Sequence, residues 1–339
     1  MGRTWWIFLW ILVAFPAGAR EWTQEDFAKR HLKAYAFQPP GEKGPSRETK
    51  TVIGHRQTWM PERGDTFLDV GRYFDLGLNS MEAANPGVDG WIPHTAKTPL
   101  VIPTSWILPC CRYEGLVVNL PEMRLYWYPP QKKGAAPVVY TFPVGLGRQE
   151  WRTPQGEFRV VEKARNPRWV IPESIREERI RETGASEKFI EGGSPDNPLG
   201  EYRLRLSMPS YAIHGTNIPW GVGMSVSHGC VRMYPEDIRE LFPMVPKDTA
   251  GAFVYETIKF GERSGRIFVE VHPDLYGLQP GPWRQASKIL RERGWEGKID
   301  EDKLLRALEQ RRGYPVDVSP SPEEITRKRS ATPATSEER

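Results

Sequence analysis

The chain has very little cysteine: 3 residues among 339, two of them adjacent at Cys110 and Cys111 and the third at Cys230. It also lacks a long internal hydrophobic run, since no such run approaches the roughly 20 residues needed to span a bilayer. Neither sign of charge is in large excess, since 47 basic and 43 acidic residues give a net charge of +4. No basic patch interleaved with aromatic residues is present, so the sequence argues against a nucleic-acid partner.

The N-terminus carries a short apolar stretch with distinctive flanks. Arg3 precedes apolar residues 5–15, and Ala17-Gly18-Ala19 has the small-residue pattern of a cleavage site. This arrangement is typical of a secretory signal peptide rather than a membrane anchor. We therefore predict a signal peptide over residues 1–19, a mature chain that begins near Arg20, and no transmembrane anchor after cleavage.

Export to an oxidising compartment makes the cysteine count informative, because paired cysteines usually form disulfides there. Cys110 and Cys111 can form a vicinal disulfide, stay reduced or pair elsewhere. Whichever pair forms, one thiol is left over, and catalysis would give a free thiol in an exported protein a reason to exist.

The chain divides by composition into several segments. Residues 20–49 form a lead-in and a linker rich in Pro, Gly and charge, and residues 50–105 form a compact unit. From 115 to 255, short strands separated by Gly and Pro turns favour a mainly β fold of the sandwich type. Residues 256–318 predict a short α-rich C-terminal extension, with a strand over 266–271 and two amphipathic helices near 283–293 and 300–312. Residues 319–339, poor in large apolar groups, predict a disordered tail.

The unit over residues 50–105 has the predicted order strand, helix, helix, strand. Thr51 to Gly54 and Leu100 to Pro103 are the strands, while Thr66 and Asn79-Ser80 are positioned to cap the helices. That order, with the sequences GDT at 64–66 and ANP at 84–86, resembles a LysM module, a small domain that binds the N-acetylglucosamine-containing glycan of cell walls. The alternative is an unrelated helical cap on the following domain.

A cysteine and two histidines, the side chains best suited to catalysis here, lie in two short segments, IHGTN at 213–217 and SHGCVRM at 227–233. A cysteine attacks as its thiolate, which a neighbouring imidazole can generate near neutral pH. His214 ends a predicted strand and Cys230 lies near the start of the next, so neighbouring strands can bring the two side chains together. We expect His214 to take the thiol proton, to return it to a leaving amine, and to lower the pKa of Cys230.

Neighbours of this pair have candidate supporting roles. The carbonyl of Gly215 can orient His214, and the N–H groups of Gly229 and Cys230 can form an oxyanion hole. His228 can donate to the same oxyanion or tune the thiolate, or it can serve only a local hydrogen bond. Ser227 can hold a turn by bonding the local backbone or contact the substrate.

Three further residues are candidate substrate contacts. Arg232 suits a carboxylate of the substrate or of the protein, Arg148 suits a substrate carboxylate or a structural ion pair, and Thr216 lies beside the histidine. A zinc site built from both histidines and the cysteine lacks an obvious fourth ligand. We therefore predict no metal and no cofactor.

The two segments together resemble the signature of the L,D-transpeptidases, whose catalytic domain is of the YkuD type. The resemblance extends upstream to GLGR at 145–148, TPQGEF at 153–158 and NPLG at 197–200, and covers roughly residues 115–255. Some members of the family carry Asn at the position of Arg232. The resemblance implies a YkuD-like β-sandwich and an exported enzyme of the Gram-negative periplasm.

The resemblance also implies a reaction. Cys230 would attack the diaminopimelate carbonyl of a peptidoglycan tetrapeptide stem, release D-alanine and form a thioester. An amine would then resolve the thioester, giving a 3→3 crosslink or attaching a wall lipoprotein, without metal or ATP. Two alternatives remain: a cysteine hydrolase that cleaves wall crosslinks or wall–lipoprotein links, and a wall-binding protein whose catalytic domain is a relic.

Overall fold

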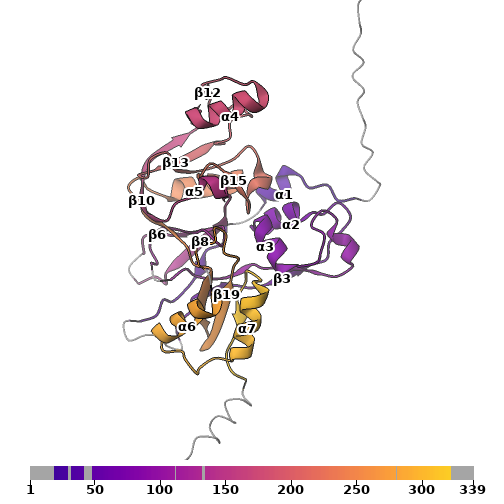
Figure 1. Cartoon of the computed structure of the whole chain (residues 1–339), viewed down its shortest axis with the longest axis vertical. Coiled ribbons are helices and arrows are strands. Elements are labelled where there is room, and N and C mark those ends of the chain that lie inside the picture. The colour runs from indigo at the N-terminus through magenta and orange to yellow at the C-terminus, as the bar shows by residue number, and fades with distance from the viewer. Residues whose placement is uncertain are drawn as a thin grey trace, which may run out of the picture.

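The computed structural model describes residues 19–29, 32–41, 48–110, 112–131, 134–279 and 281–321. Its largest element is a nine-stranded sheet (Figure 1). In spatial order the strands are β1 (Tyr35–Ala36), β8 (Val138–Pro143), β7 (Arg124–Tyr128), β6 (Gly115–Asn119), β17 (Ala250–Val254), β10 (Gly156–Arg165), β13 (Tyr202–Leu206), β14 (Ala212–His214) and β16 (Val231–Arg232). The strands predicted between residues 116 and 213 are all present.

This sheet curls until its two ends meet. Gly145, just after β8, exchanges two backbone hydrogen bonds with Arg232 of β16, each 2.9 Å from nitrogen to oxygen. Beside this bridge, β9 (Leu146–Gly147) pairs in parallel with β15 (Ser225–Ser227), which follows the 3-10 turn Pro219–Gly221. The prediction of a mainly β fold is therefore confirmed in part: the strands form one curled, mixed sheet, where a sandwich of two packed sheets was expected.

Both faces of the hairpin formed by β6 and β7 are buried, which explains why the sequence suggested a sandwich of two sheets. Leu116 and Trp127 point into the core that the curled sheet encloses together with helix α5 (Pro235–Met244). Val117 and Tyr126 point the other way, into a second core shared with the N-terminal unit. Alternation along a strand shows that a face is buried, but it does not show which element covers that face.

The N-terminal unit covers the outer face of the sheet with broken strands and two short helices. Its elements are β2 (Val52–Gly54), β3 (Gln57–Trp59), α2 (Phe67–Tyr73), α3 (Leu78–Ala84), the 3-10 turn Pro93–Ala96, β4 (Leu100–Ile102) and β5 (Ser105–Ile107), preceded by α1 (Gln24–Ala28). β2 pairs with β5 and β3 with β4, both antiparallel. The predicted strand–helix–helix–strand order is present, with each strand interrupted.

The start of α2 is set by a local capping residue, whereas the start of α3 is set by contacts with other parts of the fold. Thr66 caps α2 as predicted, its Oγ1 accepting from Asp69 N at 3.2 Å. α3 begins earlier than predicted, with Gly77 at its N-cap. Asn79 lies in the first turn, and its Nδ2 donates to the carbonyl of Glu122 at 2.9 Å. A contact with the sheet has replaced the cap that the sequence suggested.

The C-terminal unit contains the two predicted helices and the predicted strand over residues 266–271, and two further strands complete a three-stranded sheet. Its elements are β18 (Ile258–Arg263), β19 (Arg266–Val271), α6 (Pro282–Glu292), α7 (Glu301–Gln310) and β20 (Val316–Asp317). They enclose a core of their own. Ser319 is buried and its Oγ accepts from Ile267 N at 2.8 Å, so this unit extends into the region predicted as a tail. Residues 322–339 lie outside the described residues.

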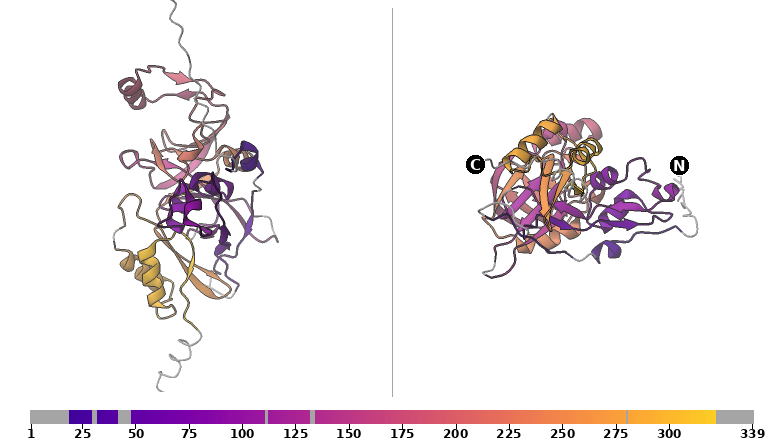
Figure 2. Two further views of the ribbon diagram at one scale, coloured as in Figure 1. Left: turned by 90° about the vertical axis from the view of Figure 1, so that its right-hand side faces the viewer. Right: turned by 90° about the horizontal axis from the view of Figure 1, so that it is seen from below.

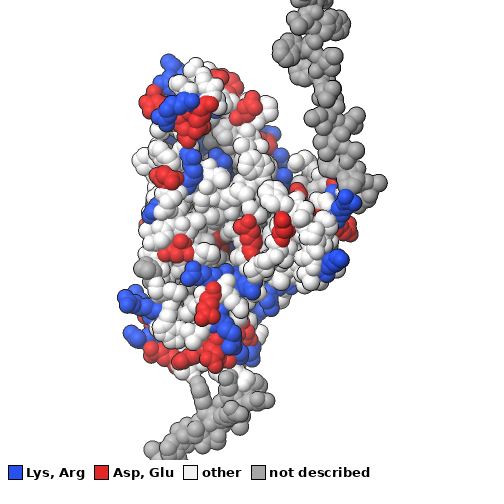
Figure 3. Space-filling model, turned by 45° about the vertical axis from the view of Figure 1, so that its right-hand side comes forward, with Lys and Arg blue, Asp and Glu red and all other residues white. Residues whose placement is uncertain are grey.

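Residues 166–201 leave the sheet between β10 and β13 as an excursion. It contains β11 (Trp169–Val170), α4 (Glu173–Thr183) and β12 (Phe189–Ile190), and α4 has no buried residue. Figure 2 shows that this excursion stands away from the sheet. Charged side chains of both signs gather over it in Figure 3, at the top of the molecule.

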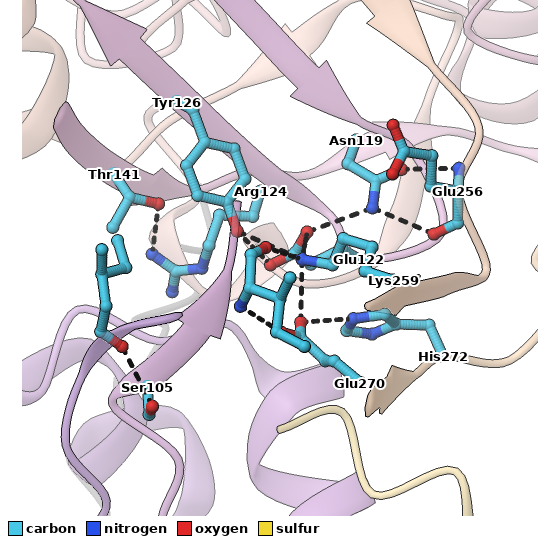
Figure 4. Close-up of polar contacts among 12 residues, drawn as sticks. Ser105, Asn119, Glu122, Arg124, Tyr126, Thr141, Glu256, Lys259, Glu270 and His272 are labelled. Atoms are coloured by element: carbon cyan, nitrogen blue, oxygen red, sulfur yellow. Dashed lines mark hydrogen bonds and ion pairs between the residues drawn. The ribbon is translucent and has the colours of Figure 1, made fainter. Parts of the chain in front are cut away.

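The sheet, the N-terminal unit and the C-terminal unit meet at a buried ion network (Figure 4). Lys259 Nζ of β18 donates to Glu122 Oε2 at 2.7 Å, to the Ile107 carbonyl at 2.6 Å, and lies 2.9 Å from Glu270 Oε1. His272 Nε2 lies 2.7 Å from that same Glu270 oxygen. Paired charges thus tie the turn after β6 to β5, β18 and β19.

The predicted signal peptide lies outside the described residues except for Ala19. No helix in the described part of the chain is both long and apolar enough to span a membrane.

Candidate active site

The sheet register brings His214 and Cys230 onto one face. β14 and β16 are parallel neighbours, with Ile213 opposite Val231 and His214 opposite Arg232. Cys230 directly precedes Val231, so the continued register puts it beside Ala212. Because residues two apart share a face of a strand, Cys230 and His214 are diagonal neighbours on the same side.

His214 is held as a neutral base. Its side chain is buried, with 3% exposure, and Nδ1 lies 2.6 Å from the Gly215 carbonyl oxygen. A carbonyl only accepts, so Nδ1 carries the proton and Nε2 keeps its lone pair. Burial, with a further contribution from the Arg232 charge, lowers the pKa of His214 to about 3. The contact with Gly215 expected from the sequence is present.

Cys230 is a free, half-buried thiol. Its Sγ lies 3.5 Å from the carbonyl oxygen of Ser210. Burial raises the pKa of this thiol, and the Ala212 backbone and the Arg232 charge, which act in the opposite direction, do not cancel that effect. The expectation of a lowered pKa is therefore wrong: the pair rests as neutral thiol and neutral imidazole, because desolvation disfavours both charged forms.

The other cysteines differ from Cys230. Cys110 is disulfide-bonded, and Cys111 lies outside the described residues. Cys110 therefore has no thiol to react, whereas Cys230 has one.

Ser227 and Gly229 shape the loop that presents the nucleophile. Ser227 Oγ accepts from Gly229 N at 3.1 Å and donates to the Cys230 carbonyl at 2.6 Å. Gly229 has φ +103°, and a Cβ there would lie 2.7 Å from the Tyr211 ring. The Gly229 N–H is thus already bonded, which leaves the Cys230 N–H as the better candidate oxyanion donor of the two. Ser227 has the local backbone role considered from the sequence.

Thr153 and Tyr276 are site-forming residues that sequence reasoning missed. Thr153 Oγ1 donates to the Gly229 carbonyl at 2.9 Å and accepts from Gly147 N at 3.1 Å. The Tyr276 hydroxyl donates to the Gly147 carbonyl at 2.9 Å. The TPQG sequence at 153–156 was a signal for Thr153, but nothing local marks Tyr276, which comes from the C-terminal unit.

The four remaining predicted residues lie in three different surroundings. Thr216 is buried and its Oγ1 accepts from Ile218 N at 3.0 Å, so it holds a turn. Arg232 is half-buried, and within the described part of the chain its Nε is buried without a hydrogen-bond partner. Arg148 and His228 lie together: Arg148 Nη2 is 2.7 Å from His228 Nε2, and both contact Glu178 of α4.

One group of described residues has ligand atoms close enough for a metal ion: Glu122, Glu270 and His272, whose atoms lie within 4.8 Å of one another. This group belongs to the junction network of Figure 4. The ammonium of Lys259 already bonds both carboxylates, so a resident positive charge stands where an ion would bind.

Comparison with known proteins agrees with this geometry. A family model for the L,D-transpeptidase catalytic domain, YkuD, matches residues 114–258. "Probable L,D-transpeptidase ErfK/SrfK" of Salmonella typhimurium is 36% identical over 73% of this chain and 80% of its own length. The chain belongs to the L,D-transpeptidase family.

Other family members show similar coverage. "Probable L,D-transpeptidase YbiS" of Escherichia coli is 37% identical over 79% of this chain and 89% of its own length. "Probable L,D-transpeptidase YcfS" of the same species is 32% identical over 79% of this chain and 85% of its own length. These L,D-transpeptidase relatives therefore match well beyond the catalytic domain, although their names say nothing of the acceptor.

Proposed function

We propose that this L,D-transpeptidase acts on peptidoglycan stem peptides, with Cys230 as nucleophile and His214 as the group that carries the proton. The observation that supports this most directly is the free Cys230 thiol on the same sheet face as His214, whose tautomer the Gly215 carbonyl fixes. That tautomer leaves Nε2 as the proton acceptor, which is what a general base requires.

In the acylation step, Nε2 of His214 takes the thiol proton while Sγ attacks the carbonyl of the third stem residue. The Cys230 N–H is the proposed donor to the oxyanion. The C–N bond then breaks, His214 returns its proton to the departing D-alanine amine, and a thioester remains. An acceptor amine reverses these steps: it attacks the thioester, loses its proton to His214, and releases the thiol.

The neutral resting pair fits this sequence of steps. Burial that raises the pKa of Cys230 and lowers that of His214 prevents an ion pair from forming in the free protein. Proton transfer is then coupled to attack on a bound carbonyl. An exported thiol of this kind is protected from the oxidation that thiolates undergo most readily.

The test of acylation is intact-protein mass spectrometry after incubation with a carbapenem, a class of compound that acylates this family. Mature wild-type protein should gain one stable adduct, and Cys230→Ala should gain none. Both proteins are checked for native circular dichroism first. Absence of an adduct on folded, reduced wild type would refute the proposed nucleophile and favour the wall-binding alternative.

The acceptor is a separate question, because crosslinking, lipoprotein attachment and hydrolysis share the acylation step. We propose that an amine is the acceptor. Purified sacculi or tetrapeptide muropeptides incubated with the enzyme should yield 3→3-linked dimers by mass spectrometry. Shortened stems alone would assign a hydrolase, and transfer to the lysine of a wall lipoprotein would assign attachment.

For the N-terminal unit we propose a LysM-like, wall-binding role. Trp91 and Ile92, in the segment between α3 and β4, and Met60, directly after β3, are exposed by 69%, 47% and 59%. The exposed aromatic ring of Trp91 suits the apolar face of a sugar ring. Trp91→Ala should reduce co-sedimentation of the Cys230→Ala protein with purified wall glycan, whereas Trp283→Ala, on α6, should not. Equal sedimentation of both variants would make the unit a structural cap.

Because the substrate is a wall component, we also propose that the predicted signal peptide directs the protein to the periplasm. Fractionation of cells that produce the full chain should place a shortened protein, beginning near Arg20, in the periplasmic fraction. Full-length protein in the cytoplasm would contradict this proposal.

A further inference from the structure

We propose that Arg148 and His228 form a subsite for a carboxylate of the stem peptide, and that Glu178 occupies this subsite in the free protein. The inference rests on the proposed function and deepens it. It assigns a substrate-binding role to two residues beside the nucleophile and a competing role to the excursion over residues 166–201.

The geometry around Glu178 is that of a bound carboxylate. Its Oε1 accepts from Arg148 Nη2 at 3.2 Å, and its Oε2 lies 2.8 Å from His228 Nε2. Each oxygen therefore faces a different donor, as in a bidentate complex. Hydrogen bonds from His228 and Arg148 hold the pKa of Glu178 below its usual range, so it stays ionised.

The carboxylate of Glu178 selects the histidine tautomer in which Nε2 carries the proton, because that nitrogen can then donate to it. Arg148 Nη2 and His228 Nε2 are 2.7 Å apart. When Nε2 carries its proton it presents an N–H to a guanidinium that also only donates. A carboxylate that accepts from both removes this conflict, and a vacated pair would favour another carboxylate.

The subsite belongs to the catalytic loop. His228 is two residues before Cys230, and the backbone N–H of Arg148 donates to the Ser227 carbonyl at 2.9 Å. The chain bends at residues 228 and 229, so the Cα atoms of His228 and Cys230 lie less than the roughly 7 Å apart that two fully extended residues would span. That separation is within the reach of a group one residue away from the carbonyl that Cys230 attacks. Trp151, exposed, flanks the subsite with its ring 5.3 Å from that of His228.

The excursion is built to release Glu178. α4 buries none of its residues. Within the described part of the chain, its other ion pairs stay inside the excursion: Arg176 with Glu173, and Arg179 with Glu187. Glu178 therefore provides the ion pairs that connect α4 to the catalytic loop, and ion pairs between partly exposed side chains contribute little net stability. A substrate carboxylate can displace it.

A tetrapeptide donor has two carboxylates at suitable positions: that of the departing D-alanine and the free carboxylate on the diaminopimelate side chain. Three donors distinguish them: the free tetrapeptide, its C-terminal amide, and the peptide amidated on diaminopimelate. Wild type, Glu178→Gln, Arg148→Gln and the control Glu177→Gln, on the same helix and exposed, are compared with each donor.

We expect Glu178→Gln to lower KM for the free tetrapeptide about threefold to tenfold with kcat unchanged within about twofold, because competition for the subsite is gone. Arg148→Gln should raise that KM about tenfold or more. In wild type one of the amidated donors should bind at least about tenfold more weakly, and in Arg148→Gln this discrimination should disappear. The amide that shows it identifies the carboxylate. Glu177→Gln should match wild type.

Direct binding keeps this test separate from turnover. Calorimetric titration of the donors into Cys230→Ala, alone and combined with Glu178→Gln or Arg148→Gln, measures the subsite without chemistry. If wild type binds the donors with this discrimination but releases no D-alanine, the proposed reaction fails and the subsite stands. If Glu178→Gln weakens binding as Arg148→Gln does, or discrimination survives in Arg148→Gln, the subsite proposal is overturned.

Discussion

The active site and the junction network both bury titratable groups, but they do so in opposite ways. At the active site, burial keeps His214 and Cys230 neutral, and neither side chain forms an ion pair within the described residues. At the junction, Lys259 stays charged because Glu122 and Glu270 surround its ammonium at 2.7 and 2.9 Å. One cluster is neutral in the free protein, and the other depends on charge to hold three parts of the chain together.

This difference predicts separate consequences of mutation. A neutral pair contributes little electrostatic energy to the fold, so its loss should affect chemistry far more than stability. A buried ion network leaves an uncompensated charge when one member is removed, so its loss should affect stability far more than chemistry. The experiments below test whether the two clusters separate in this way.

The largest effect is expected at His214. His214→Ala removes the proton acceptor, and the rate of carbapenem adduct formation should fall about 10² to 10⁴-fold. The free energy of unfolding in urea should change by about 2 kcal/mol or less. A rate within tenfold of wild type would mean that another group carries the proton. It would contradict the claim that loss of His214 affects chemistry far more than stability.

Lys259→Met should have the largest effect on stability. It leaves Glu122 and Glu270 buried without their cation, and the free energy of unfolding should fall by about 3–5 kcal/mol. The control is Lys288→Met on α6, whose exposed side chain lies 3.8 Å from Glu292 and should contribute about 0.5 kcal/mol or less.

The rate of adduct formation per folded molecule supplies the second readout for Lys259→Met, and it should remain within about threefold of wild type. If Lys259→Met kept full stability but lost activity, the junction network would not have the purely stabilising role proposed for it. That result would make the junction a functional element.

Glu256 sits at the edge of the network without an ion pair in the described part of the chain. Burial raises its pKa to about 7, although the Cys110 N–H donates to its carboxylate at 3.0 Å. Since the folded pKa lies above the unfolded value of 4.5, Glu256 contributes stability below pH 4.5, and that contribution is lost as the pH rises toward and through 7.

Glu256→Gln should therefore stabilise the protein at pH 8 by up to about 3 kcal/mol, because each tenfold change in a protonation equilibrium corresponds to roughly 1.4 kcal/mol. The gain should vanish near pH 4. Unfolding in urea at both pH values measures it, with the exposed Glu177→Gln as control. Equal effects of Glu256→Gln at both pH values would show that packing rather than charge is responsible.

The sequence predicts local structure well where one signal acts alone. Thr66 caps α2, the hairpin of β6 and β7 forms on either side of its Pro-Glu turn, and His214 bonds the neighbouring carbonyl as expected. Each of these depends on residues a few positions apart. The proposed catalytic residues His214 and Cys230 are likewise close in sequence, within the segments at 213–217 and 227–233, which is why the sequence alone could suggest them.

Features that depend on distant contacts were not predictable in this way. The sheet closes through Gly145 and Arg232, which lie far apart in the chain. Tyr276 reaches the site from the C-terminal unit, and Glu178 reaches it from the excursion. The predicted direction of the pKa shift at Cys230 was wrong for the same reason. A neighbouring histidine is visible in the sequence, whereas burial is a property of the folded chain.

The smallest effect is expected at Arg232, and it tests the electrostatics of the neutral pair. The Arg232 charge lowers the pKa of Cys230 against the larger opposing effect of burial. Arg232→Gln should therefore raise that pKa further, and alkylation by iodoacetamide at pH 8 should fall about twofold to fivefold, since only the thiolate reacts. Across pH 7–10 the rate should rise with pH in both proteins and lag in the variant.

Arg232→Lys, which keeps the charge, should follow wild type. A faster reaction in Arg232→Gln would mean that opening the site outweighs the lost charge, and the neutrality of the pair would then rest on burial alone.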